Sequence, residues 1–264
     1  MNLLVKGRAT GPAIVQVTPA SAGWRHVGFA AHRMAADERL EFDTGDREFC
    51  IVLLSGTVSI GAGNQHWGPL VGRASVFEPR SPHAVYVPGG QAVSINAGSA
   101  AEVALCSAPA RTRREARLIE PASMRRTVRG AGANTRYVCD ILPQTEPADG
   151  LLVVEVLTPA GHSSSYPPHK HDADNIPSES ALEETYYHRI NPPQGFAFQR
   201  VYTDDRSLDQ SMAVEDHDVV MVPRGYHPVV MPFGYDGYYL NVMAGPVREW
   251  HFKNDPAHEW MLGQ

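Results

Sequence analysis

The sequence contains few cysteines, no long apolar run and no excess of positive charge. Its 3 cysteines, Cys50, Cys106 and Cys139, are widely spaced and include no CxxC pair. This pattern excludes a disulfide framework and a cysteine-based metal site, and it predicts buried free thiols in a reducing compartment. The chain has no apolar run of about 18 residues and no signal peptide with a basic start and an apolar core. We therefore expect a cytoplasmic protein that has no membrane partner.

The charge balance argues against nucleic acid as a partner. The chain has 23 Lys and Arg against 29 Asp and Glu, a formal net charge of -6, whereas phosphate binding needs surplus basic residues. The longest basic cluster, residues 111–117 with Arg125, Arg126 and Arg129, lies in the middle of the chain and is interpreted as a solvated linker or a subunit contact. With 264 residues, 43% of them hydrophobic, the chain can form one large or two modest domains.

Glycine and proline divide the sequence into short apolar segments. The 23 Gly and 21 Pro are scattered between runs rich in Val, Ile, Leu, Tyr and Phe. Short strands separated by turn residues predict an all-β sandwich or barrel. The expected strands are residues 49–54, 57–60, 84–87, 93–95, 103–106, 151–157, 185–190, 196–201, 219–222 and 238–242. Residues 111–124 and 203–210 are expected to form one short helix each.

The order of these segments is repeated in the two halves of the chain. In the first half, a strand that begins at Glu48 is followed by a hairpin, by residues 72–79 ending in Pro79, and by His83. In the second half, a strand that begins at Glu184 leads through residues 216–223 to His227. Internal repetition of this kind indicates two β-barrels of common ancestry. We assign residues 1–110 to the first barrel, 111–135 to a linker and 136–264 to the second barrel.

The second half carries a set of candidate metal ligands. His169 and His171 are separated by one residue, and on a strand side chains at i and i+2 face the same side. Glu184 and His227 complete a set of three histidines and one glutamate that suits zinc, manganese, iron or nickel. Glu183 is the alternative carboxylate, but strand alternation places Glu184 on one face with Tyr186 and His188.

The first half lacks such a set. Only Glu48 and His83 occupy comparable places, and no HxH pair precedes Glu48. We expect the first barrel to bind no metal and to serve structure or assembly.

These motifs resemble those of a known superfamily. HxH, Glu and a later Pro-x-Gly-x-His are similar to the two motifs of the cupin superfamily, and the two halves look like a bicupin, an all-β protein of two jelly-roll barrels. More specific segments resemble the KduI/IolB isomerase family, namely residues 164–172, 182–190, 222–228, 237–245 and 248–258. The similarity extends over nearly the whole chain. The long interval between His171 and Glu184 departs from typical cupins but matches this family.

The resemblance implies an aldose–ketose isomerase that converts 5-deoxy-D-glucuronate to 5-dehydro-2-deoxy-D-gluconate in myo-inositol catabolism. Alternatives are 5-keto-4-deoxyuronate isomerisation in pectin catabolism and a metal-dependent cupin dioxygenase. It also implies one divalent metal ion held by His169, His171, Glu184 and His227, with positions left open so that the ion can chelate the substrate and stabilise an ene-diolate.

Isomerisation of this type needs a group that moves a proton between two carbons, unless a hydride shift is used. Under the resemblance, we expect this group among inward-facing residues near the ion: Tyr186, His188, Tyr226, Tyr238 and Glu183. The partner is a small-molecule sugar acid, and Arg200 and Arg224 are the candidates for binding its carboxylate. Open barrel edges and the aromatic stretch Trp250–Trp260 predict a homo-oligomer.

Overall fold

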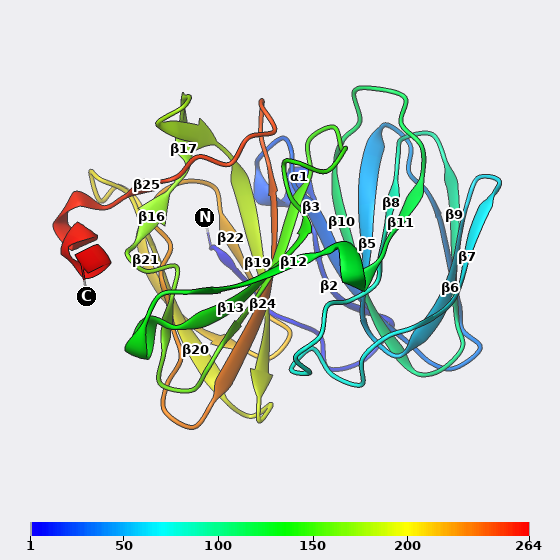
Figure 1. Ribbon diagram of the computed structural model, residues 1–264, viewed down its shortest axis with the longest axis horizontal. Helices are drawn as coiled ribbons and strands as arrows, with labels where there is room; N and C mark the ends of the chain where they lie inside the picture. Colours follow the sequence, from blue (N-terminus) through cyan, green and yellow to red (C-terminus); the bar gives the residue numbers. More distant parts are fainter. Residues whose placement is uncertain (1, 264) are drawn as a thin grey trace.

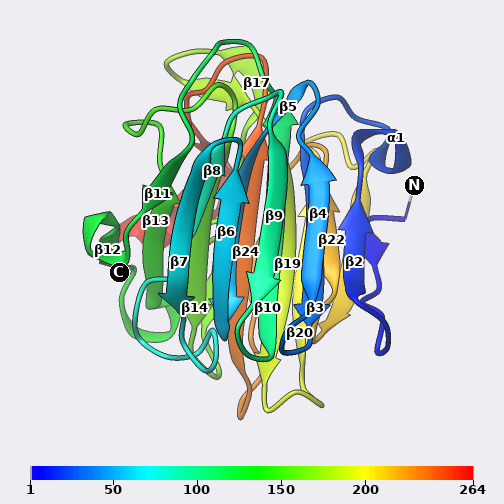
Figure 2. The same ribbon diagram turned by 90° about the vertical axis from the view of Figure 1, so that its right-hand side faces the viewer.

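The computed structural model describes residues 2–263 and arranges them as two antiparallel β-barrels packed side by side (Figure 1). Each barrel consists of one large and one small sheet. The first barrel has a 6-stranded sheet in the order β11-β8-β5-β10-β3-β2 and a 4-stranded sheet in the order β4-β9-β6-β7. The small sheet covers the outer face of the large one (Figure 2). The strands of this barrel are β2 (Ala13–Val17), β3 (Gly28–Met34), β4 (Arg39–Asp43), β5 (Arg47–Ser55), β6 (Thr57–Ala62), β7 (Gln65–Val71), β8 (Ala84–Val87), β9 (Ala92–Ala97), β10 (Ala101–Pro109) and β11 (Arg117–Ile119).

The second barrel has a 7-stranded sheet in the order β1-β22-β19-β24-β14-β13-β12 and a 4-stranded sheet in the order β15-β23-β20-β21. Two further short pairs belong to this barrel: β16 pairs with β25 from the end of the chain, and β17 and β18 form a hairpin. The strands are β1 (Leu4–Val5), β12 (Arg125–Arg129), β13 (Arg136–Leu142), β14 (Leu152–Thr158), β15 (Ser163–Ser164), β16 (His169–Lys170), β17 (Asp172–Asn175), β18 (Glu179–Ala181), β19 (Glu183–Asn191), β20 (Phe196–Tyr202), β21 (Asp209–Glu215), β22 (Val219–Val222), β23 (Val229–Val230), β24 (Asp236–Ala244) and β25 (Lys253–Asn254).

The two large sheets pack against each other and share one apolar core. Phe29 and Cys106 of the first barrel lie in the same buried cluster as Tyr187 and Leu240 of the second. A separate core fills the interior of each barrel. Because the large sheets are buried on both faces, β8 and most of β10 are apolar without alternation. The outer strand β21, in contrast, alternates between exposed and buried residues.

The all-β prediction is confirmed, and each of the expected strands overlaps a strand of the structure, with 151–157 starting one residue before β14. The two expected helices are wrong. Residues 111–116 are irregular, and Asp149 accepts hydrogen bonds from the backbone N–H groups of Arg111 and Thr112. The 3-10 helix Pro121–Ser123 is the helical part of residues 111–124. Residues 203–208 form a turn in which Asp205 accepts hydrogen bonds from Thr203 and from the backbone N–H of Ser207.

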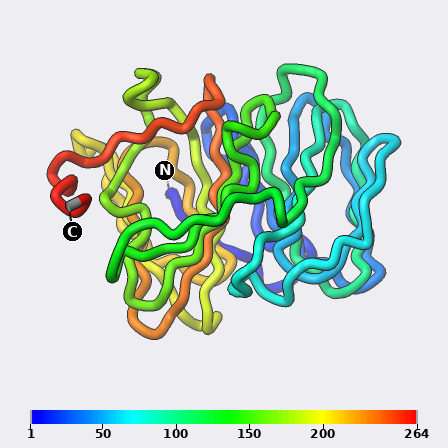
Figure 3. Tube along the Cα trace, viewed as in Figure 1, coloured from blue at the N-terminus to red at the C-terminus, as the bar shows by residue number. Residues whose placement is uncertain are grey.

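The helices of the described residues are short. They are α1 (Pro19–Ala22) and the 3-10 helices Pro121–Ser123, Gly132–Asn134 and Pro256–Gly263. Among residues 2–263, none is long and apolar enough to cross a membrane. The chain after β24 passes over the second barrel, and the 3-10 helix Pro256–Gly263 lies on the side of this barrel that is remote from the first barrel (Figure 3).

The segment expected to be a linker contains strands of both barrels. Within residues 111–135, β11 extends the 6-stranded sheet and β12 extends the 7-stranded sheet. At the start of the chain, β1 pairs with β22 of the second barrel. A division at 110 and 136 therefore does not follow the sheets exactly. The chain crosses between the barrels twice, once between β1 and β2 and once between β11 and β12.

Candidate metal centre and its cavity

Three of the expected ligands meet inside the second barrel. One ligand atom from each of His171, Glu184 and His227 lies within 4.8 Å of the other two. The Oε2 atom of Glu184 is 3.1 Å from Nε2 of His171 and 3.3 Å from Nε2 of His227. All three side chains are buried. A cation between these three atoms could be bound by all of them, in place of the direct contacts of Glu184 with the two histidines.

Strand alternation on β19 selects Glu184 for this cluster. Glu184 and Tyr186 face the interior of the second barrel, whereas Tyr187 faces the core between the barrels. The side chain of Glu183 points away from the cluster, since its oxygens accept hydrogen bonds from the backbone N–H groups of residues 25–27. The structure thus places the preferred carboxylate, and not the alternative, beside the histidines.

His169 lies next to the cluster but outside the group of close ligand atoms. The centre of its ring is 4.9 Å from that of His227 and 6.4 Å from that of His171. The short strand β16, which carries His169, pairs with β25, and the ring of Phe252 contacts His169 at 4.7 Å between centroids. His169 lines the same cavity as Glu184. His169 is therefore a neighbour of the cluster and not one of its three converging side chains.

The backbone fixes the orientation of two imidazoles. Nδ1 of His227 is 2.8 Å from the carbonyl oxygen of Gly225, and Nδ1 of His171 is 3.2 Å from that of Leu182. A neutral imidazole that donates through Nδ1 presents a lone pair at Nε2, the atom that binds a metal. Nε2 of His227 is buried and makes no hydrogen bond within the described residues. The residues present therefore fit a bound metal ion.

Burial also keeps two of the histidines neutral. It lowers the pKa of His169 and of His227 to about 3. For His171, burial acts in the same direction, but the hydrogen bond and the charge of Glu184 outweigh it and raise its pKa on balance. Neutral imidazoles are the form that coordinates a cation.

A cavity of about 250 Å³ opens beside this cluster. Its walls combine aromatic rings with polar groups and two arginines. The polar and charged residues that line it are Arg129, Arg136, Ser165, Tyr166, His169, Glu184, Tyr186, Tyr239, Asn241, Trp250 and Asn254. The volume suits a small molecule, and two of the candidate ligands, His169 and Glu184, form part of the wall.

Of the expected proton-transfer residues, Tyr186 lines the cavity. Its hydroxyl is 3.2 Å from Oγ of Ser165, and burial raises its pKa well above the usual value. His188 lies further along the same face of β19, with its ring stacked on Tyr186 at 6.0 Å. It is not a lining residue, and its Nε2 is 2.9 Å from Oε1 of Gln199. Burial lowers the pKa of His188 to about 4.

The other two expected tyrosines lie elsewhere. The hydroxyl of Tyr238 donates to Glu155 in the core between the barrels, so Tyr238 does not face the cavity as expected. Its neighbour Tyr239, on the opposite face of β24, lines the cavity instead. The hydroxyl of Tyr226 donates to Asp204 at 2.9 Å, within a polar network.

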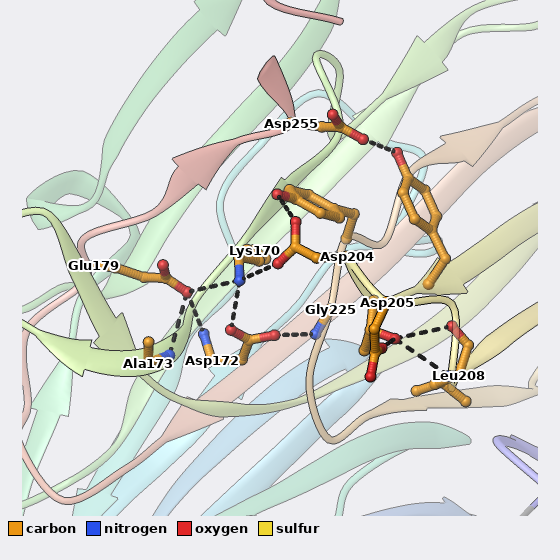
Figure 4. Close-up of polar contacts among 12 residues, drawn as sticks. Lys170, Asp172, Ala173, Glu179, Asp204, Asp205, Leu208, Gly225 and Asp255 are labelled. Atoms are coloured by element: carbon orange, nitrogen blue, oxygen red, sulfur yellow. Dashed lines mark hydrogen bonds and ion pairs between the residues drawn. The ribbon is translucent and has the colours of Figure 1, made fainter. Parts of the chain in front are cut away.

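That polar network joins the loop after the HxH pair to the turn before His227 (Figure 4). Asp172 accepts hydrogen bonds from Nζ of Lys170 at 3.1 Å and from the backbone N–H of Gly225 at 2.7 Å. Lys170 also donates to Asp204 at 2.8 Å. The carbonyl of Gly225 accepts a hydrogen bond from Nδ1 of His227. The network therefore links the position of the HxH pair to the position of His227.

Neither of the arginines expected to bind a carboxylate lines the cavity. Arg200 forms a two-pronged ion pair with Asp209, with distances of 2.7 and 2.6 Å. Arg224 is exposed and lies 3.4 Å from Oγ of Ser207. Arg129 and Arg136 occupy the cavity wall instead. Sequence reasoning assigned Arg129 to a solvated cluster and did not consider Arg136.

Two antiparallel barrels, with a buried histidine–glutamate cluster in the second, define a two-barrel cupin protein. Comparison with known proteins gives the family: a model of the KduI/IolB family matches residues 3–261, and the chain belongs to this family.

Relatives and solved structures agree with this assignment. The chain is 54% identical over 249 residues to the 5-deoxy-glucuronate isomerase of Geobacillus kaustophilus, covering 94% of this chain and 90% of the relative. It is 49% identical over 257 residues to that of Listeria monocytogenes serovar 1/2a, covering 96% and 94%. The crystal structure of an IolB-like protein from Salmonella typhimurium superposes with a TM-score of 0.98 at 46% identity, covering 99% and 100%. Oxalate decarboxylase from Lactobacillus farciminis shares the fold, with a TM-score of 0.66 at 12% identity and coverage of 100% and 91%.

Proposed function

We propose that this chain is an aldose–ketose isomerase that converts 5-deoxy-D-glucuronate to 5-dehydro-2-deoxy-D-gluconate with the help of one divalent metal ion. Relatives at 54% and 49% identity carry the name 5-deoxy-glucuronate isomerase. The structural observation that supports the proposal most directly is the buried, unpartnered Nε2 of His227, which faces Glu184 at one side of a cavity. Such an atom indicates a missing partner, and a cation satisfies it.

His169, His171, Glu184 and His227 would hold the ion, and their chemistry suits zinc, manganese, iron or nickel. When bound, the ion acts as a Lewis acid that polarises the substrate carbonyl and favours the negative charge that develops during isomerisation. The rings of Phe252 and Trp250 line the same cavity.

Isomerisation moves one hydrogen from the hydroxyl-bearing carbon to the carbonyl carbon, by a hydride shift or through a base, and one proton from the hydroxyl oxygen to the carbonyl oxygen. The second of these transfers needs a carrier in the cavity. Tyr186 holds a proton at Oη, and Ser165 orients that hydroxyl. The Oη of Tyr186 can donate this proton to the oxygen that gains negative charge and recover a proton from the neighbouring hydroxyl. His188 acts behind Tyr186 by supporting its ring rather than by contacting substrate.

We further propose that the protein acts in the cytoplasm and assembles as a homo-oligomer. The buried free cysteines agree with a reducing compartment. Exposed apolar side chains favour an assembly, since large apolar groups at a surface often mark an interface. They include Val128, Phe252, Trp260 and Leu262.

Metal analysis combined with an activity assay tests the proposed function. We expect the purified protein to contain about one divalent ion per chain and to isomerise 5-deoxy-D-glucuronate. Chelation should abolish turnover, and a divalent ion should restore it. His227→Ala should lose both metal and activity while keeping its β-sheet circular dichroism, because the barrel core is apolar. The control His66→Ala changes an exposed histidine of the first barrel and should keep both.

Three results would contradict the proposal. One is full activity in the metal-free protein. Another is a clear preference for 5-keto-4-deoxyuronate over 5-deoxy-D-glucuronate. The third is consumption of oxygen during turnover, which would indicate a dioxygenase.

A further inference from the structure

Two arginines of the cavity wall face each other across a hairpin. Arg129 on β12 and Arg136 on β13 are directly paired in the antiparallel register, and both line the cavity. Like charges in directly opposed positions of a sheet destabilise it unless something compensates them. The burial of Arg136, together with the charge of Arg129, lowers the pKa of Arg136. The two arginines therefore place positive charge at the cavity wall, and their mutual repulsion does not stabilise the hairpin.

Among the residues that the structure describes, no acidic side chain forms an ion pair with either arginine. Within residues 2–263, Nη1 of Arg136 donates only to the carbonyl and side-chain oxygens of Asn134, at 3.0 and 3.1 Å. The guanidinium of Arg129 lies over the ring of Trp250, 5.7 Å from its centre. Each guanidinium has five N–H donors, so most donors of both residues are available for a ligand.

Two further donors of the same cavity lack partners. The indole nitrogen of Trp250 is buried and makes no hydrogen bond within the described residues. The amide nitrogen of Asn241, a side chain only 5% exposed that is paired in register with Tyr186, is buried and makes no hydrogen bond among residues 2–263. Buried donors without partners are costly, and a ligand that supplies acceptor oxygens removes that cost.

We propose that Arg129, Arg136, Trp250 and Asn241 form a carboxylate subsite that binds the acid group of the sugar-acid substrate. This inference rests on the proposed function and adds the group that recognises the acid. In 5-deoxy-D-glucuronate the carboxylate lies at the opposite end of the carbon chain from the two carbons that react. One cavity holds both ends: the histidine–glutamate cluster takes the reacting end and the arginine pair takes the carboxylate.

A carboxylate is the ligand that this set of donors fits. Guanidinium groups bind a carboxylate through two parallel N–H···O bonds, a geometry that a neutral hydroxyl cannot match. A carboxylate also brings the negative charge that the arginine pair lacks. The subsite therefore makes the cavity selective for sugar acids over neutral sugars of the same size.

Binding measurements test the subsite separately from catalysis. Calorimetry on the manganese-loaded protein would compare D-glucuronate with D-glucose as probes. We expect the wild type to bind the acid at least 10-fold more tightly. Arg136→Met should weaken binding of the acid about 10- to 100-fold, with unchanged binding of the neutral sugar and unchanged metal content. Arg136→Lys should give an intermediate value, because it keeps the charge but loses the two-pronged geometry.

Arg125→Met is the matched control, since Arg125 lies on the same strand, is exposed and is not a lining residue. It should bind both probes as the wild type does. Equal binding of acid and neutral sugar by the wild type, or unchanged binding of the acid by Arg136→Met, would overturn the subsite. An isomerase assay with 5-deoxy-D-glucuronate, run in parallel, reports on the proposed function. A wild type that binds the acid selectively but does not turn over would contradict the function and leave the subsite supported.

Discussion

At the scale of single residues, the face on which a side chain lies decides its role. Along β24, Tyr239 and Asn241 face the cavity, while Tyr238 faces the core between the barrels. Along β19, Glu184 and Tyr186 face the cavity, while Glu183 holds backbone N–H groups of the first barrel. Neighbours in sequence therefore serve unrelated purposes, and a comparison of a tyrosine that faces the cavity with one that faces the core between the barrels separates catalysis from stability.

Tyr186→Phe tests the role assigned to the hydroxyl of Tyr186. Loss of a group that donates a proton should lower kcat about 100-fold, with metal content unchanged. Tyr238→Phe removes a hydroxyl of the same kind that donates to buried Glu155. It should keep kcat and lower the free energy of unfolding by about 1 kcal/mol, as measured in urea. Equal kcat values for the two variants would remove Tyr186 from the mechanism.

The sequence located a site residue correctly where a rule about neighbouring positions, such as strand alternation, was sufficient. Alternation alone favoured Glu184 over Glu183, and the structure places Glu184 with the histidines. No local rule located Arg136 or Trp250, because their approach to the cavity depends on how β13 and the segment before β25 pack on the barrel. Alternation extended from Tyr238 along β24 would have offered Tyr239 and Asn241 as the inward-facing alternatives.

At the scale of elements, the turn between β22 and β23 positions His227. Gly225 in this turn has a φ of 90°, accepts a hydrogen bond from His227 through its carbonyl and donates one to Asp172. A Cβ atom at Gly225 would lie 2.5 Å from the carbonyl oxygen of Tyr202. The turn therefore tolerates glycine alone, for reasons of both conformation and space.

Gly225→Ala and Gly234→Ala form a matched pair that isolates the effect of space. Gly234 has a φ of 89°, but a Cβ there would meet nothing within 4 Å. Gly234→Ala should cost about 1 kcal/mol from backbone strain alone. Gly225→Ala should cost about 1–3 kcal/mol more and also lower the metal content, because the turn must shift and His227 shifts with it. Equal metal contents in the two variants would show that this turn does not position the ligand.

Element type followed from the sequence wherever an apolar run was long enough. Each expected strand exists, but short or polar strands such as β12 and β17 were not expected. The segment of β12, Arg-Arg-Thr-Val-Arg, contains a single large apolar residue, and its extended form comes from pairing with β13. The two incorrect helices have a similar cause, because Asp149 and Asp205 hold these segments in irregular or turn conformations.

At the scale of the whole molecule, the first barrel supports the second through a buried carboxylate. Glu48 begins its strand in the place that corresponds to Glu184, but its oxygens accept hydrogen bonds from the backbone N–H groups of residues 149–151, at 2.6 to 2.7 Å. The hydroxyl of Tyr86 donates to it at 2.6 Å. In the first barrel this glutamate thus joins the two barrels through backbone hydrogen bonds.

Glu48→Gln tests this role because it keeps the shape of the side chain and removes its charge. One of the two acceptor oxygens becomes an N–H₂ group that faces backbone N–H donors, so the free energy of unfolding should fall by about 3 kcal/mol in urea. Glu115→Gln, at an exposed position without contacts among the described residues, should change it by less than about 0.5 kcal/mol. Metal content and kcat should stay at wild-type levels in both variants below the unfolding transition, because neither residue lines the cavity. Loss of metal from Glu48→Gln at unchanged stability would instead make the first barrel part of the site.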